Sequence, residues 1–467
     1  MAADAEAIAL TPSPTAATSP SRPAQPNISL GLIVVLLVAG HLAFGANRTD
    51  VALEFSVLYG ISFLALRYLT RWGRAAAARW SGLALPALLF VTMLLAAGLA
   101  MTPWAVGGPN PVWTYVPSAL PAAVLDRSAV LIEMVKLCGL ACLFCTGVLV
   151  AQDPERGRRF LHLLLIAMSI YAAWAFISHL ADPRTVLGVA KIFHRNRLTA
   201  SFLSANTAAT LLGYVGVLVA ALSLERIREA SRGGWRLDRA ASAGGPTLVV
   251  LAVILVSVLL TASRAGLAAT FAGLAIFAVW ELFSQPWRKP SPQTLLILAG
   301  AVIGVAALAG AADLVSSRLT DLSADSAIRR ELFESHWRAF LASPWSGYGL
   351  GNFYAVNRMI ENPINYENLS YVRALHNVYI QWLEEGGLTA AAPMFACIGW
   401  ILVSTALGAH RRRRMTTWMR ALVCASAVIL IHGATDYGLQ VPSIAATWAC
   451  LLGLGFGLAN APRGSHA

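Results

Sequence analysis

The chain has 467 residues, of which 57% are hydrophobic and only 12% are charged. A soluble domain carries about 25% charged residues, so this composition excludes an ordinary soluble protein. Apolar runs of about 20 residues recur along the whole length, which predicts membrane-spanning helices rather than the short alternating strands of a membrane barrel. The net charge of +12 lies mostly in short loops between these runs, so it indicates membrane orientation and no nucleic-acid partner is expected.

The hydropathy pattern predicts an all-α polytopic membrane protein with about twelve transmembrane helices. Residues 1–27, rich in Ala, Pro, Ser and Thr, are expected to form a disordered cytoplasmic tail. Helices one to nine fall within residues 28–314, helices ten to twelve within 388–460, and residues 461–467 form a second cytoplasmic tail. The expected spans are 28–46, 51–68, 82–101, 128–150, 160–180, 199–224, 246–261, 265–283, 294–314, 388–408, 417–433 and 441–460.

The basic loops give the orientation. The loops containing RYLTRWGRAAAAR, DPERGRR, ERIREASRGGWRLDR, QPWRKP and HRRRR all fall on one side if both termini are cytoplasmic. The other side, the periplasm of a bacterium, receives the loops 102–127 and 181–198 and one large loop, 315–387. Residues 326–344 of that loop have helical periodicity and predict an amphipathic helix over the membrane or the bundle. Its expected apolar face consists of Leu332, Phe333, Trp337, Phe340 and Leu341.

Several arginines on the outer side break the charge rule. Arg195 and Arg197 precede the sixth span, and Arg264 occupies the hairpin tip TASRAG. Positive charge held there calls for lipid headgroups, acidic residues of the same loops or an anionic substrate. Arg264 either extends to headgroups or binds a phosphate of a lipid-linked substrate, because guanidinium grips phosphate oxygens in bidentate fashion.

Two further stretches concentrate polar residues at the outer side. NRLTASFLSANTAATLL, residues 196–212, either caps a helix or forms a polar funnel with Asn206 directed into the bundle. RALHNVYIQWLEEGGL, residues 373–388, contains His376, which is either a structural hydrogen-bonding residue or a base near neutral pH. Arg373 would keep that histidine neutral. Glu384 and Glu385 either orient partner groups or favour water at the interface.

The motifs RLTASFLSANTAA, TASRAG, SPWSGYGLGNF and ALHNVYIQWLEEGGL, in this order, resemble the O-antigen ligase and polymerase family over about residues 195–440. That family is bacterial and includes Wzy-type polymerases and protein O-oligosaccharyltransferases. The resemblance implies a glycosyltransferase of the GT-C type in the inner membrane, independent of metals and cofactors. It would take a glycan from undecaprenyl diphosphate on the periplasmic face. The chain departs from the family pattern at Ser204-Ala205, where Asn-Pro is common, and at Ala390.

The resemblance also implies roles for individual residues. Arg197 and Arg264, with help from Arg195, would neutralise the donor diphosphate, and His376 would accept the proton of the attacking hydroxyl in a single inverting displacement. Asn206 matches the last asparagine of the family's motif at the start of the sixth span. Further candidates for substrate contacts are Asn377, Arg373, Tyr348 and Asn352.

The acceptor stays open between lipid A–core, which would make the protein an O-antigen ligase and is preferred, and a second lipid-linked glycan, which would make it a polymerase. A flippase for lipid-linked glycan would also suit twelve spans, but no internal repeat is seen and the polar residues lie at one face rather than at mid-depth. A non-catalytic scaffold would not need His376. Glu133 and Lys136, the main mid-membrane charges, are expected to pair with each other.

Overall fold

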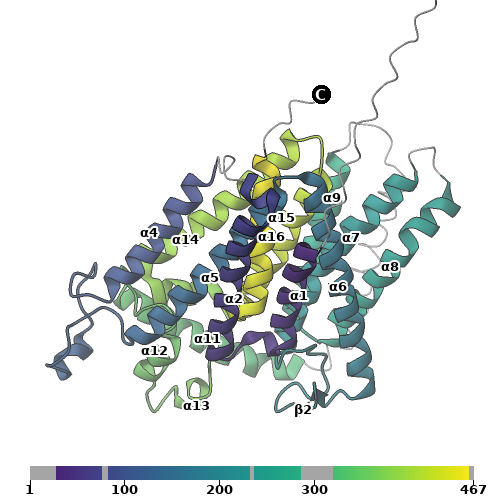
Figure 1. Cartoon of the computed structure of the whole chain (residues 1–467). Coiled ribbons are helices and arrows are strands. Elements are labelled where there is room, and N and C mark those ends of the chain that lie inside the picture. Colours follow the sequence, from purple (N-terminus) through teal and green to yellow (C-terminus); the bar gives the residue numbers. More distant parts are fainter. Residues whose placement is uncertain (1–27, 76–81, 232–235, 285–318, 462–467) are drawn as a thin grey trace, which may run out of the picture.

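The computed structural model describes residues 28–75, 82–231, 236–284 and 319–461. Long helices run side by side in one bundle (Figure 1), and the described strands form a single short hairpin, β1 (Thr185–Val186) and β2 (Val189–Ala190). Nine of the described helices are long and apolar enough to cross a membrane. The protein is therefore an all-α polytopic membrane protein, which confirms the prediction from composition.

Every predicted span within the described residues corresponds to a helix. The predicted span 294–314, the tail 1–27 and residues 462–467 lie outside the described residues. Two apolar helices are shorter than the nine candidate spans, α1 (Ile28–Leu42) and α4 (Ala84–Ala100). The nine are α2 (Thr49–Leu69), α5 (Arg127–Ala151), α6 (Pro154–Ala181), α7 (Ala205–Ala230), α8 (Leu237–Leu260), α9 (Arg264–Phe283), α14 (Val378–Arg411), α15 (Thr416–Gly433) and α16 (Pro442–Asn460).

Two helix starts differ from the prediction. The helix α7 begins at Ala205 instead of residue 199, because the Ser204 hydroxyl caps it by accepting from the Thr207 N–H at 3.4 Å. The helix α14 begins at Val378 instead of residue 388, but it is broken at Gly387, where φ is 57° and ψ is −174°. A Cβ on Gly387 would lie 2.1 Å from the carbonyl oxygen of Trp345, so only glycine fits this break.

The helices α7 and α16 form the centre of the bundle. The apolar windows of these two are 94% and 83% buried, whereas those of α2 and α8 are 22% buried. A helix that is apolar all round is expected to be buried, and small residues allow close crossing. At the crossing of α5 and α16, a Cβ on Gly453 would lie 1.9 Å from the carbonyl oxygen of Phe144. This tight centre fixes the loops at both ends of the bundle.

One end of the bundle carries most of the loop structure. The helices α11 (Leu319–Ala342), α12 (Phe353–Ile360) and α13 (Tyr366–Leu369) lie with β2 at the lower end in Figure 1. The predicted amphipathic helix is present within α11, but its predicted apolar face is partly wrong. Leu332 and Phe340 are buried, whereas Trp337 and Leu341 are 41% and 57% exposed. The side of α11 that faces inward includes a polar residue, His336. Hydropathy alone could not predict that this residue is buried.

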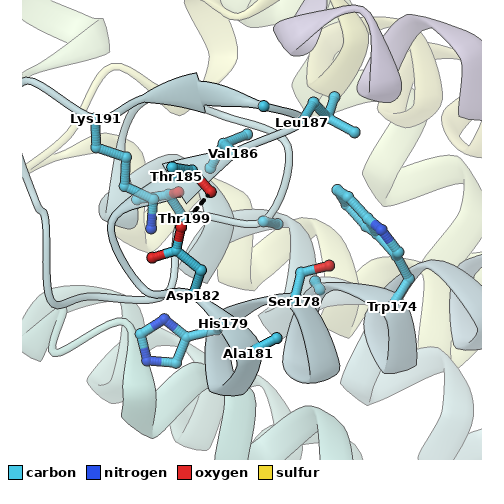
Figure 2. A pocket seen from close by; sticks show the side chains of 13 residues that line it. Trp174, Ser178, His179, Ala181, Asp182, Thr185, Val186, Leu187, Lys191 and Thr199 are labelled. Carbon is cyan, nitrogen blue, oxygen red and sulfur yellow. Dashed lines mark hydrogen bonds between the residues drawn. The ribbon is translucent and has the colours of Figure 1, made fainter.

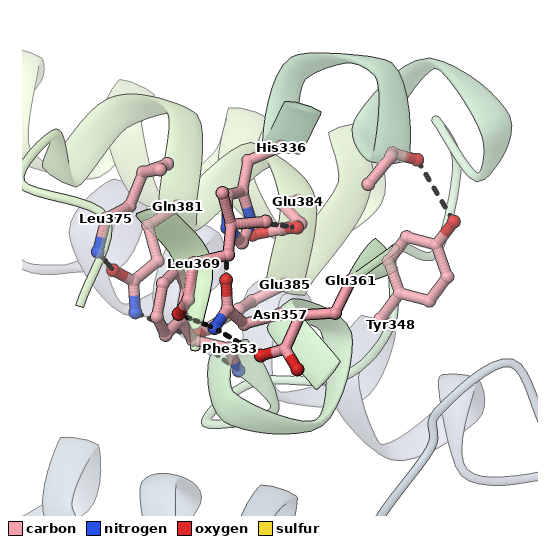
Figure 3. Close-up of polar contacts among 11 residues, drawn as sticks. His336, Tyr348, Phe353, Asn357, Glu361, Leu369, Leu375, Gln381, Glu384 and Glu385 are labelled. Carbon is pink, nitrogen blue, oxygen red and sulfur yellow. Dashed lines mark hydrogen bonds and ion pairs between the residues drawn. The ribbon is translucent and has the colours of Figure 1, made fainter. Parts of the chain in front are cut away.

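A buried polar cluster holds α11 against α14 (Figure 3). The His336 Nδ1 lies 2.7 Å from Glu384 Oε1, and its Nε2 lies 3.2 Å from Asn357 Oδ1. Beside it, the Glu385 carboxylate accepts from the backbone N–H of Gly351 at 2.9 Å. Glu384 and Glu385 are both buried, so they orient partner groups and do not serve to attract water.

Short single-turn elements complete the described chain. They are the 3₁₀ helices η1 (Phe44–Ala46), η3 (Pro111–Tyr115) and η4 (Gly438–Gln440), and the helix α3 (Arg71–Ala75). The turn η4 matters most for function, because it directly follows the segment in which the site below is centred.

Candidate active site

Asp436, in the segment between α15 and η4, is the centre of a polar cluster at the loop-rich end. Its carboxylate is buried, and Oδ1 lies 3.3 Å from His376 Nδ1 and 3.3 Å from Asn206 Nδ2. The other oxygen, Oδ2, is buried without a hydrogen-bond partner among the described residues. Three segments far apart in sequence therefore meet here: the start of α7, the residue pair before α14 and the loop after α15.

His376 is held in an orientation that suits a base. Its ring contacts Tyr437 edge-on, with the ring centroids 4.8 Å apart, and its Nδ1 faces Asp436. Because the carboxylate accepts a hydrogen bond from Nδ1–H, the lone pair of the neutral ring lies on Nε2. The side chain is 31% exposed, so a substrate can reach it. An imidazole that is oriented by a carboxylate and is accessible to a substrate has the arrangement of a general base.

Unusual backbone geometry gathers in the loops that carry this cluster. His376, His194, Ala200 and Ala262 have φ between 49° and 58°, the left-handed region that side chains disfavour. Each such residue costs about 1–3 kcal/mol and persists only where the surroundings enforce it. The observation supports a functional role for this end of the bundle.

The three predicted arginines lie in two neighbouring segments. Leu198 donates a backbone hydrogen bond to Leu260 at 2.9 Å, which joins the segment containing Arg197 to the turn containing Arg264. Arg197 is half-buried, and Arg195 and Arg264 are exposed. Among the described residues, no carboxylate lies within ion-pair distance of any of the three. These guanidinium groups therefore remain available to an anion.

Two contacts relate the arginine segments to the Asp436 cluster. A Cβ on Gly266, two residues into α9 from Arg264, would lie 2.5 Å from the Ala209 side chain of α7 and 3.2 Å from His432. Close to Arg197, burial lowers the pKa of His194 from its ordinary 6.5, and the charge of Arg197 lowers it further while Asp436 opposes the shift. Arg197 and Asp436 therefore both act on the charge of His194.

Four of the predicted substrate contacts have other partners in the structure. Asn377 caps α14, because its Oδ1 accepts from the Tyr379 and Ile380 N–H groups and its Nδ2 donates to Ala434 at 3.0 Å. The Tyr348 hydroxyl donates to the carbonyl of Ala339 at 3.1 Å.

Asn352 and Arg373 are engaged elsewhere too. The Asn352 side chain bonds both backbone groups of Asp126. Arg373 stacks over the Tyr354 ring at 4.6 Å. The structure thus gives these residues positioning tasks, and their direct contact with a substrate stays a prediction.

Asp436 was missed by the sequence analysis. A signal was present, since it is the single acidic residue in the short outer segment between the last two predicted spans. A carboxylate between two apolar helices calls for a partner. Its pairing with His376 crosses 60 residues and that with Asn206 crosses 230, so spacing alone could not assign it.

A large cavity is lined by residues of α2, α4, α5, α14 and α16. Its volume is about 980 Å³ and most of its lining is apolar, with Gln440, Tyr379 and Arg373 at the loop-rich end. The Glu133–Lys136 ion pair also lines it, which confirms that these two charges pair with each other. Such a volume and lining suit a hydrocarbon chain.

Fold and site together define a polytopic membrane protein with a cationic, histidine-containing site at one end. The family model described as O-antigen ligase, Wzy_C, matches residues 248–395, a range that includes Arg264 and His376. This match shows that part of the chain is similar to the O-antigen ligase family. No curated protein matches the chain. Similarity to this family indicates glycosyl transfer of the ligase or polymerase type in surface-polysaccharide synthesis, with lipid-linked glycans as substrates.

Proposed function

We propose that the protein is an O-antigen ligase of the bacterial inner membrane. It transfers a glycan from undecaprenyl diphosphate to a hydroxyl of lipid A–core on the periplasmic face, as a metal-independent, inverting enzyme of the GT-C type. The observation that carries this proposal is the contact between His376 Nδ1 and Asp436 Oδ1 at 3.3 Å, beside arginines without acidic partners.

The proposed reaction is one displacement at the anomeric carbon. His376 Nε2 takes the proton of the acceptor hydroxyl as the oxygen attacks, and the bond from the anomeric carbon to the phosphate oxygen breaks with its electron pair leaving on the diphosphate. Asp436 stabilises the imidazolium that forms. General-base assistance of this kind contributes roughly 10²–10⁴-fold. A single attack from the opposite face inverts the configuration.

The arginines stabilise the leaving group. As the bond breaks, negative charge grows on the diphosphate, and preorganised cations lower the energy of that state. Arg197 and Arg264 project from joined segments, and Arg195 lies two residues from Arg197. Guanidinium groups bind phosphate oxygens in pairs, so two or three of them match a diphosphate.

The apolar cavity is large enough to hold the hydrocarbon chain of a second lipid substrate. A ligase and a polymerase both join two lipid-anchored molecules, so each needs room for hydrocarbon beside the reacting groups. The cavity of about 980 Å³ provides it and reaches Gln440, four residues beyond Asp436 in sequence. The alternative acceptor, a second lipid-linked glycan, would make the protein a polymerase with the same chemistry.

A reconstituted assay tests the proposal. The purified protein in liposomes receives the lipid-linked repeat alone and then together with lipid A–core. A ligase gives product only with lipid A–core, whereas a polymerase extends the repeat alone. The His376→Ala variant should give no product while still binding the donor. Transfer by this variant at the unmodified rate would exclude the general-base role, and glycan movement across empty liposomes without transfer would indicate a flippase.

A further inference from the structure

A second cavity lies between the outer end of α6 and the loop that carries the β hairpin (Figure 2). We call it the hairpin pocket. Its volume is about 300 Å³, the lower end of the range for small-molecule sites. The side chains that matter below are Trp174, Ser178, His179, Asp182, Lys191 and Thr199. The mechanism above uses none of them.

Two buried polar atoms at this pocket have no partner among the described residues. Thr199 is 1% exposed, and its Oγ1 makes no hydrogen bond there; the same holds for the buried Nδ1 of His179. A buried hydroxyl left unsatisfied costs about 1–3 kcal/mol. A native protein retains such a group where something else completes it. Both residues line the hairpin pocket, so a ligand with hydroxyl groups placed in it would supply the missing bonds.

The pocket also offers a carboxylate and a cation. Asp182 Oδ1 accepts from the Arg184 N–H at 2.9 Å and Oδ2 accepts from the Thr185 hydroxyl at 2.8 Å. These bonds, the backbone one first, hold the pKa of Asp182 below its ordinary value, so it is an ionised acceptor. Lys191 is 5% exposed, and no carboxylate of the described chain lies within ion-pair distance of its ammonium group.

The opposite wall is apolar. Figure 2 shows Trp174 and Leu187 across the pocket from Lys191, Asp182 and Thr199. A pyranose ring has a face of C–H groups and an edge of hydroxyls, so it presents an apolar side to an aromatic ring and polar groups to hydroxyls and carboxylates. The two walls of the hairpin pocket match these two sides.

The hairpin pocket lies beside the segment that contains Arg197, which is proposed to bind the donor diphosphate. The Lys191 ammonium donates to the backbone carbonyl of Arg197 at 3.0 Å, and Thr199 follows two residues later. A glycan whose diphosphate is held at Arg197 therefore begins beside this pocket.

We propose that the hairpin pocket binds one sugar residue of the donor glycan, next to but distinct from the sugar that reacts. The binding itself does not depend on the chemistry proposed for His376. Only the statement that the bound sugar belongs to the donor rests on the proposed function.

Direct binding tests the proposal without any transfer. The protein is placed in phosphatidylcholine nanodiscs, and the probe is the free oligosaccharide released by mild acid from the host's lipid-linked glycan. Saturation-transfer NMR and calorimetry report binding. Trp174→Leu should weaken the affinity about tenfold or more, since it removes the stacking face. Thr199→Val should weaken it about three- to tenfold, the value of one hydrogen bond.

The controls separate binding from folding. Thr199→Val removes an unsatisfied buried hydroxyl, so the melting temperature of the unliganded protein should stay equal or rise while glycan binding falls. Trp104→Leu changes a tryptophan that is 79% exposed in another outer loop, and it should leave the affinity unchanged. His376→Ala should bind the free oligosaccharide like the unmodified protein, so loss of transfer and loss of the pocket are distinguished.

Two results would overturn the proposal. One is oligosaccharide binding that is absent, or that neither Trp174→Leu nor Thr199→Val weakens. The other is loss of oligosaccharide binding when phosphatidylglycerol replaces phosphatidylcholine, which would assign the pocket to a lipid headgroup.

Discussion

The same three helices, α7, α9 and α15, end very differently at the two ends of the bundle. At the end predicted to be cytoplasmic, Glu281 of α9 lies 2.8 Å from Arg228 of α7 and 2.8 Å from Arg420 of α15. At the other end, α9 begins with Arg264, for which the described residues supply no carboxylate. The buried carboxylate of the first end is paired with two arginines, whereas the exposed guanidinium of Arg264 at the second end has no carboxylate partner among the described residues.

Within each of these helices, one end stabilises the fold and the other end carries the candidate site. A buried ion pair is costly to break, because a lone charge stays in a medium that solvates it poorly. An exposed arginine does not carry this cost, so it can stay unpaired until an anion binds. The ion-paired ends therefore fix the positions of α7, α9 and α15, and the loop-rich ends use those positions to present Asn206, Arg264 and the Asp436 loop. Four variants test this division.

Among these four variants, the largest effect on activity is expected from Asp436→Asn. The amide can no longer stabilise the imidazolium of His376, so transfer should fall by roughly 10³–10⁴-fold. The fold should survive because the side chain keeps its shape and its contact with Asn206. The measurement is the initial transfer rate, with donor binding as the control. A rate within tenfold of the unmodified protein would show that His376 works without this carboxylate.

The largest effect on stability is expected from Glu281→Gln. Removing this charge leaves Arg228 and Arg420 without a carboxylate at the inner end, which should cost about 3–5 kcal/mol of unfolding free energy. Thermal melting in detergent measures it. The rate per folded molecule should stay the same, since the site lies at the other end. Loss of rate without loss of stability would contradict the division between the two ends.

A smaller effect on donor affinity is expected from Arg264→Ala. Loss of one guanidinium contact should weaken donor binding by about tenfold, the scale of one charge-assisted hydrogen bond, and leave the melting temperature unchanged. Arg264→Lys should restore only part of the affinity, because an ammonium group cannot bind two oxygens side by side. Arg48→Ala is the matched control, as Arg48 is exposed at the start of α2 and pairs with Asp50. Equal donor binding by the Ala variant would place the diphosphate elsewhere.

The smallest effect concerns pH and His194. Burial and Arg197 lower its folded-state pKa below the ordinary 6.5, so the unfolded chain takes up the proton first. Stability should therefore be constant above pH 7 and should decrease as the pH falls through about 6.5. Melting temperatures between pH 7.5 and 5 measure this decrease, and His194→Gln should reduce it. An unchanged pH profile in the variant would assign the decrease to other groups.

The sequence was informative wherever the physics is local. Runs of apolar residues located every candidate membrane span within the described chain, and spacing by three residues identified the Glu133–Lys136 pair. Family motifs singled out Arg264 and His376, which the O-antigen ligase model covers. Helix ends were less exact, because the hydroxyl of Ser204 and the break at Gly387 set them and hydropathy does not register either.

Hydrogen bonds between distant segments needed the tertiary structure. The role of Asp436 depends on the contacts that the loop after α15 makes with His376 and Asn206. The side of α11 that faces inward is determined by the contact of His336 with Glu384, 48 residues away. Hydropathy reports how each residue partitions between water and lipid, and it does so independently of partners. Which polar side chain is satisfied inside the protein depends on the packing of several helices at once, and that was decided by the fold alone.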